Sequence, residues 1–111
     1  MNAYAIPGID RDVVGDVFNQ VCKIFYKKPE EVMQKVNSRG RTYVLIRQLT
    51  MAILRQKTLM SYSEIGDVFR KDHATAIHSV KAIDNLRETD KQFKRMTDKF
   101  FTKKDNETIR I

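Results

Sequence analysis

The chain has 111 residues, of which 41% are hydrophobic and 32% are charged, and this balance predicts one globular domain. The net charge of +7 and the pI near 9.7 are in the range of nucleic-acid-binding domains. The single Cys22 excludes a disulfide scaffold, no stretch reaches the roughly 20 apolar residues of a membrane span, and the opening residues lack the pattern of a signal peptide, so we expect a cytoplasmic protein.

The positive charge is concentrated in the middle of the sequence. Residues 27–57 carry eight basic and two acidic side chains, whereas residues 1–26 carry two basic and three acidic ones. Residues 58–111 are closer to balance, with eleven basic and nine acidic side chains. A local excess of this kind indicates an anion-binding surface rather than a uniformly solvated exterior.

The first forty residues predict two helices and a loop. Asp10 can cap a helix in which apolar residues recur every three or four positions. These apolar residues are Val13, Val14, Val17, Phe18, Val21, Cys22, Ile24 and Phe25. Pro29 at a first helical position, followed by two acidic residues, predicts a short helix through about Gln34. Asn, Ser and Gly between residues 37 and 41 then predict a loop.

The remaining sequence predicts further helices and no strand. The longest periodic segment runs from about Thr42 to Lys57, and its inward face comprises Ile46, Leu49, Ala52 and Ile53. Ser61 and Glu64 have the spacing of a capping box, which opens a short helix carrying Ile65, Val68 and Phe69. Asp72 can cap the next helix, which carries Ala76, Val80, Ile83 and Leu86. Asp90 can cap a last amphipathic helix, which carries Phe93, Met96, Phe100 and Phe101.

The predicted fold is therefore an all-α domain of five to six helices that contains a helix-turn-helix. We place an N-terminal arm at residues 1–9, the helix-turn-helix domain at 10–90, and an amphipathic helix with a frayed basic tail at 91–111. The segment 61–83 carries the outline of the motif, since a short capped helix, a tight connection and a longer amphipathic helix follow one another.

The first turn of that longer helix has side chains suited to reading DNA bases. The carboxylate of Asp72 can accept from a cytosine amine, His73 and Thr75 can bond to a base or a phosphate, and the methyl of Ala74 can pack on thymine. The connection before it carries Arg70 and Lys71. The alternative is that Asp72 only caps the helix and that His73 is an ordinary surface histidine.

A second cationic feature is the loop around Gly40. Arg39 and Arg41 can reach into a narrow minor groove, where the negative potential of DNA is strongest. Arg47, Gln48 and Arg55 follow on the next helix and can track a phosphate strand. The alternatives are a solvated charged loop and pairing of Arg47 with Glu30 or Glu31. If both features read DNA, the loop and the helix that begins at Asp72 must lie on one side of the fold, with His73 exposed.

Enzymatic interpretations have little support in the sequence. One cysteine and two histidines do not supply a metal site, and His73 and His78 do not share a helix face. Cys22 lies in an apolar stripe, where a core position is the better interpretation than a nucleophile paired with His73. No P-loop or dinucleotide-type glycine-rich turn is present. We expect no catalysis, no metal and no cofactor.

Four short motifs together point to a known family. They are Ser38-Arg39-Gly40-Arg41, Arg47-Gln48-Leu49-Thr50-Met51-Ala52, Ser61-Tyr62-Ser63-Glu64-Ile65-Gly66 with Phe69, and Asp72-His73-Ala74-Thr75. On these motifs, the sequence from about Val13 to Leu86 resembles the C-terminal DNA-binding domain, domain IV, of the bacterial replication initiator DnaA. The resemblance implies a Trp-repressor-like helix-turn-helix that binds double-stranded DNA, with a DnaA-box-like target.

The resemblance also implies roles for individual residues. Arg39 matches an arginine that enters the minor groove, with Arg41 beside it, and Asp72 and His73 match base-reading residues. Ser61 and Tyr62 fall where the short helix approaches the DNA backbone. The DNA-binding residues that we predict are Arg39, Arg41, Arg47, Gln48, Arg55, Ser61, Tyr62, Lys71, Asp72, His73, Ala74, Thr75 and His78.

Three departures from the family pattern bear on the target. Ala74 stands where the family has a threonine, Leu45 stands where an arginine is common, and the turn before Asp72 is one residue shorter, which can rotate or shift the recognition helix. The initiator's ATPase module needs a Walker loop, so we expect this domain to act without nucleotide. As a stand-alone domain it can mark a site, compete with the initiator, regulate transcription or serve a phage or mobile element.

Two other functions stay open at this point. One is an interaction module that binds an acidic protein partner, such as a regulator of replication, through the same basic surface. The other is binding to single-stranded DNA or RNA. That function has less support, because aromatic residues make up only 9% of the chain and most fall on stripes predicted to be buried.

Overall fold

The computed structural model describes residues 11–101, and this part of the chain is helical with no strand. The helices are α1 (Arg11–Ile24), α2 (Pro29–Gln34), α3 (Arg41–Lys57), α4 (Tyr62–Asp67), α5 (His73–Thr89) and α6 (Lys91–Phe101). The all-α prediction is therefore confirmed. None of the described helices is long and apolar enough to cross a bilayer.

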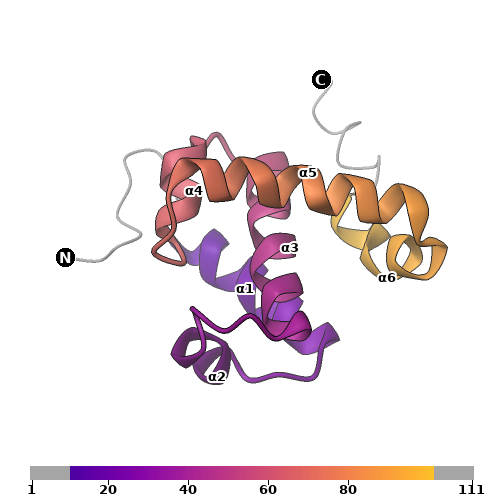
Figure 1. The fold of residues 1–111 in the computed structure, drawn as a ribbon, viewed down its shortest axis with the longest axis horizontal. Coiled ribbons are helices and arrows are strands. Elements are labelled where there is room, and N and C mark those ends of the chain that lie inside the picture. Colours follow the sequence, from indigo (N-terminus) through magenta and orange to yellow (C-terminus); the bar gives the residue numbers. More distant parts are fainter. Residues whose placement is uncertain (1–10, 102–111) are drawn as a thin grey trace.

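Helix α3 lies at the centre of the fold, between α1 and α5 (Figure 1). Its predicted inward residues Ile46, Leu49, Ala52 and Ile53 are all buried. Because other helices pack on several sides of it, α3 also buries Arg47, Thr50, Met51 and Leu54, which the predicted stripe did not include. The hydrophobic core gathers around this helix, and it draws apolar residues from all six helices.

The predicted helix starts are confirmed wherever the structure describes them. Ser61 accepts from the Glu64 amide while the Glu64 carboxylate accepts from the Ser61 amide, so the capping box is complete. Asp72 Oδ1 accepts from the Thr75 amide at 2.9 Å, and Asp90 Oδ1 accepts from the amides of Gln92 and Phe93. The predicted cap at Asp10 lies outside the described residues.

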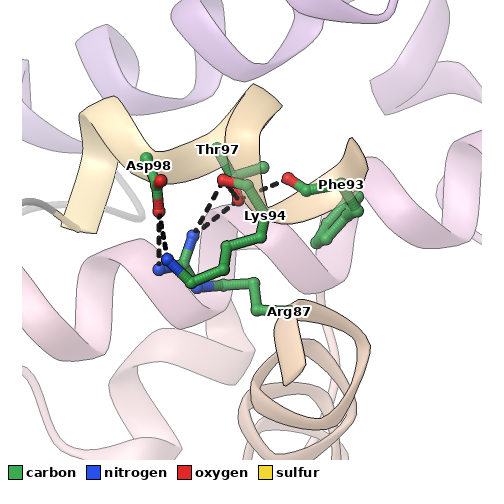
Figure 2. A network of polar contacts seen from close by, with 5 residues as sticks. All are labelled: Arg87, Phe93, Lys94, Thr97 and Asp98. Carbon is green, nitrogen blue, oxygen red and sulfur yellow. Dashed lines mark hydrogen bonds and ion pairs between the residues drawn. The ribbon is translucent and has the colours of Figure 1, made fainter. Parts of the chain in front are cut away.

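Helix α6 docks against the C-terminal half of α5, and Arg87 of α5 makes the polar contacts between them (Figure 2). Arg87 donates to Thr97 Oγ1 at 2.7 Å and pairs with Asp98 at 3.1 Å, and its guanidinium lies 4.3 Å from the centroid of the Phe101 ring. Phe93 and Phe100 of α6 join the same core as α1 and α3. Met96 was predicted on this apolar face but is 36% exposed, because α6 covers the fold from one side only. The expected basic tail from residue 102 onward is outside the described residues.

Candidate nucleic-acid interface

Helices α4 and α5 and the turn between them form the predicted helix-turn-helix. Helix α4 ends at Asp67, earlier than predicted, and Val68 and Phe69 stay buried in the turn that follows. The Arg70 amide donates to the Asp67 carbonyl at 3.1 Å, and the Lys71 amide donates to the Gly66 carbonyl at 2.9 Å. Together with the positive φ of 59° at Arg70, these bonds form a Schellman motif, which closes the helix. The short turn is therefore a regular helix end rather than a distorted one.

Gly66 sets the distance between α4 and the start of α5. A Cβ at this position would lie 2.6 Å from the Lys71 carbonyl oxygen and 2.7 Å from the Asp72 carbonyl oxygen. Neither backbone atom can move aside without moving the first turn of α5. In the sequence Gly66 stands only as part of a motif, and this steric role could not be read from its spacing.

The first turn of α5 is exposed, as predicted. Asp72, His73 and Ala74 are exposed, Thr75 is half-buried, and His78 is exposed one turn further on. The N-cap role of Asp72 is confirmed, and the hydrogen bond from the Thr75 amide lowers the pKa of its carboxyl group. The bases that these side chains contact stay a prediction.

Arg47 of α3 anchors the loop of residues 37–40, here called the basic loop. It is only 8% exposed, and its guanidinium donates to the Lys35 carbonyl at 3.1 Å and to the Ser38 carbonyl at 2.7 Å. Burial lowers the pKa of this guanidinium. The alternative of an Arg47 pair with Glu30 or Glu31 does not hold, since the guanidinium is occupied by backbone carbonyls and Glu31 binds the Tyr43 hydroxyl and the Lys27 ammonium instead. Arg39 on this loop and Arg41, the first residue of α3, are both exposed.

One side-chain contact places the loop next to the helix-turn-helix. Lys71 Nζ donates to Asn37 Oδ1 at 3.0 Å, across 34 residues of sequence. The loop and the start of α5 therefore lie on one side of the fold, with His73 exposed, as the DNA-reading interpretation requires. Asn37 was not among the predicted site residues, because a turn-forming asparagine gives no signal of a distant partner.

A small open cavity between α3 and α5 brings further predicted residues together. It has a volume of about 190 Å³, and four of the predicted DNA-binding residues line it, namely Arg47, Gln48, Lys71 and Thr75. Gln48 and Arg55 are seven residues apart in α3, so both project from the same face of the helix. The predicted residues of α3 therefore extend from this cavity toward α4.

Arg55, Ser61 and Tyr62 form a separate group where α4 begins. The Arg55 guanidinium lies 4.0 Å from the centroid of the Tyr62 ring and donates to the Met60 carbonyl at 3.2 Å. The Ser61 hydroxyl accepts the capping bond from Glu64. Arg55 thus ties α3 to the start of α4, while its side chain stays exposed to solvent.

Cys22 and His73 do not come together as a nucleophile pair. Cys22 is fully buried, and burial together with the charge of Glu30 raises the pKa of its thiol to about 11. This confirms its core position, and His73 is exposed on the first turn of α5. Among residues 11–101, no three His, Cys, Asp or Glu side chains gather in a way that could hold a metal.

A comparison with protein families identifies the fold. The model described as the bacterial DnaA protein helix-turn-helix matches residues 14–83, which include the basic loop, the α4–α5 turn and most of α5. The chain belongs to this DnaA family. The resemblance drawn from the sequence motifs is thereby confirmed.

Several chromosomal replication initiator proteins named DnaA are similar to this chain. DnaA 2 of Chlamydia caviae is 43% identical over 67 residues, which cover 60% of this chain and 14% of that protein. DnaA of Flavobacterium psychrophilum is 36% identical over 94 residues, covering 84% of this chain and 20% of that protein. This chain therefore spans a fifth or less of the length of these relatives. No solved structure matches the chain.

Proposed function

We propose that this DnaA-type domain binds double-stranded DNA sequence-specifically and without catalysis. The start of α5 lies in the major groove, and Arg39 of the basic loop enters the adjacent minor groove with Arg41, at the start of α3, beside it. The hydrogen bond between Lys71 and Asn37 carries the proposal, because it holds these two cationic features side by side with the reading residues exposed. The membership of the DnaA helix-turn-helix family supports the same function.

The contacts divide into those that position the domain and those that read bases. Gln48, Arg55 and Lys71 contact phosphates, together with the start of α4 at Ser61 and Tyr62. Asp72, His73 and Thr75 contact base edges, Ala74 packs on a thymine methyl, and His78 lies one turn deeper along the groove. Arg47 positions the basic loop through its two carbonyl bonds, and its exposed edge in the cavity is the part that can reach a phosphate.

The target in this proposal is a site similar to a DnaA box. The relatives are named chromosomal replication initiator proteins, so a role in replication initiation, or in competing with an initiator for its sites, follows for this domain. Nucleotide binding and ATP hydrolysis have no part in this function. The location that fits it is the cytoplasm, where chromosomal DNA is accessible in bacteria.

Selection of binding sites from a random duplex library tests the proposal. We expect one enriched motif, and with about five neutralised phosphates a slope of log affinity against log salt of about −4 to −5. His73→Ala relaxes specificity at about one base-pair position at a cost of about 1–3 kcal/mol, whereas Arg55→Ala weakens binding to all sequences alike. Selection that enriches no motif, together with identical behaviour of the two variants, would refute the proposal. Release from duplex DNA at low salt would instead favour an acidic protein as the partner.

A further inference from the structure

Arg70 occupies a backbone position that favours glycine. Its φ of 59° lies in the left-handed region, where the Cβ of an L-residue crowds the following carbonyl oxygen. The position is the C′ residue of the Schellman motif that closes α4, and glycine adopts it without this strain. The turn itself therefore gives no reason for an arginine here.

The Arg70 side chain takes no part in the polar contacts of the described residues. It is exposed, and it makes no hydrogen bond, ion pair or ring contact with any other residue in the described range 11–101. Its neighbour Lys71 differs, because its ammonium donates to Asn37. Of the two cations in the turn, Arg70 is therefore the one whose side chain has no partner within the described residues.

The place of Arg70 defines the chemistry of that ligand. It stands two residues before the N-cap Asp72 and three before His73, at the end of α5 that carries the positive pole of the helix dipole. When such a helix enters a major groove by its N-terminus, the turn ahead of it passes over the phosphates at the groove edge. A guanidinium matches a phosphate in charge and can donate two parallel hydrogen bonds to it.

We propose that Arg70 is a DNA-contact residue that binds a backbone phosphate beside the base pairs read by α5. The assignment rests on the proposed function and adds a residue to it. It also gives the shortened turn a role, since the residue that closes the turn supplies a phosphate contact of its own. Lys71, in turn, combines its phosphate contact with a positioning role through Asn37.

If Arg70 binds a phosphate, the single variant Arg70→Gly should change thermal stability and DNA affinity in opposite directions. Arg70→Gly removes the side chain and relieves the backbone strain, so we expect its Tm to rise by a few degrees while its affinity for the selected duplex falls about three- to tenfold. The slope of log affinity against log salt should become shallower by about 0.9, the value for one phosphate contact. A residue that only stabilised the turn could not give this combination.

Two further variants control the experiment. Arg70→Lys keeps the charge, so it should retain the wild-type salt slope. Arg95→Ala removes one exposed cation from α6, which lies at the opposite end of α5 from the turn (Figure 1), and it should leave the slope unchanged. Tm and duplex binding by fluorescence anisotropy across a salt series are measured for all three variants and the wild type.

The outcomes separate this assignment from the proposed function. If the wild type selects a duplex motif and Arg70→Gly binds it with unchanged affinity and slope, the Arg70 assignment is wrong and the proposed function stands. The assignment is also wrong if Arg70→Gly loses affinity and Tm together, or if Arg95→Ala flattens the slope equally. If the wild type selects no motif and His73→Ala and Arg55→Ala behave identically, both fall.

Discussion

Lys71 Nζ lies 3.0 Å from Asn37 Oδ1, and this bond joins the turn before α5 to the loop before α3. Both groups are exposed, so the bond adds little to the stability of the fold. Its effect is geometric, because it fixes the position of the basic loop relative to the helix that carries Asp72 and His73.

Asn37→Ala tests this geometric role. Loss of one exposed, charge-assisted bond should weaken binding to the selected duplex by about 0.5–1 kcal/mol, roughly two- to fivefold, with no change in Tm. In a double-mutant cycle with Lys71→Ala, the two effects should be less than additive, since each variant breaks the same bond. Strictly additive effects would show that the two residues act separately.

Arg47→Ala should destabilise the fold rather than only weaken DNA binding. It leaves the carbonyls of Lys35 and Ser38 without their donor at a partly buried site, at a cost of about 1–2 kcal/mol in the free energy of unfolding. Arg47→Lys keeps the charge but cannot span both carbonyls, so it should recover only part of that loss. Urea denaturation measures both variants. Wild-type stability in Arg47→Ala would mean that the loop does not depend on this residue.

Gly66 and Gly15 form a matched pair of helical glycines. Gly66→Ala places a methyl group against the Lys71 and Asp72 carbonyls, so we expect a loss of about 1–3 kcal/mol in stability and weaker duplex binding as α5 shifts. Gly15→Ala in α1 meets nothing within 4 Å and should stabilise the protein by about 0.5–1 kcal/mol, with duplex binding unchanged. Similar effects from the two substitutions would contradict the close approach at Gly66.

The lowered pKa of the Asp72 carboxyl group predicts that the stability of the fold depends on pH in the acid range. The amide of Thr75 lowers the pKa of this carboxyl below its ordinary value of 3.8, so the charged form favours the native state. Its contribution is complete above that ordinary value and declines as the pH falls through the lowered native-state pKa. Asp72→Asn keeps a capping oxygen but does not titrate. Its Tm should therefore fall less steeply with acidification than that of the wild type, and parallel curves would exclude this role.

Arg87 and Lys94 both reach Asp98, but we expect unequal consequences from their removal. The Arg87 side chain is 16% exposed and also binds Thr97, so Arg87→Ala should cost about 1.5–3 kcal/mol and loosen α6. The Lys94 side chain is 53% exposed, and Lys94→Ala should change stability by less than about 0.5 kcal/mol. Calorimetry of the two variants makes the comparison. Equal losses would contradict a specific role of Arg87 in holding α6 to α5, since the Lys94–Asp98 pair lies within α6.

Local pattern predicted the parts of this fold that depend on neighbouring residues. The caps at Ser61, Asp72 and Asp90 were correct because a cap is decided within three residues of sequence. The burial of Arg47 was missed, since an arginine in a helix is read as solvent-facing and its acceptors come from the chain 9 and 12 residues earlier. The Lys71–Asn37 bond, the close approach at Gly66 and the strain at Arg70 depend on how α4, α5 and the loop pack, which no periodicity encodes.

The basic loop is attached to the rest of the fold both through Arg47 and through Lys71. This double attachment has a consequence for the DNA target. Because the basic loop and the start of α5 are held in one rigid body, the protein sets the number of base pairs between the minor-groove contact and the major-groove contact. In the proposed complex, one base pair inserted between these two contacts would shift one contact site relative to the protein by the rise and twist of one base-pair step. Such a site would be bound through only one of the two grooves, even if the sequence in each groove were the preferred one.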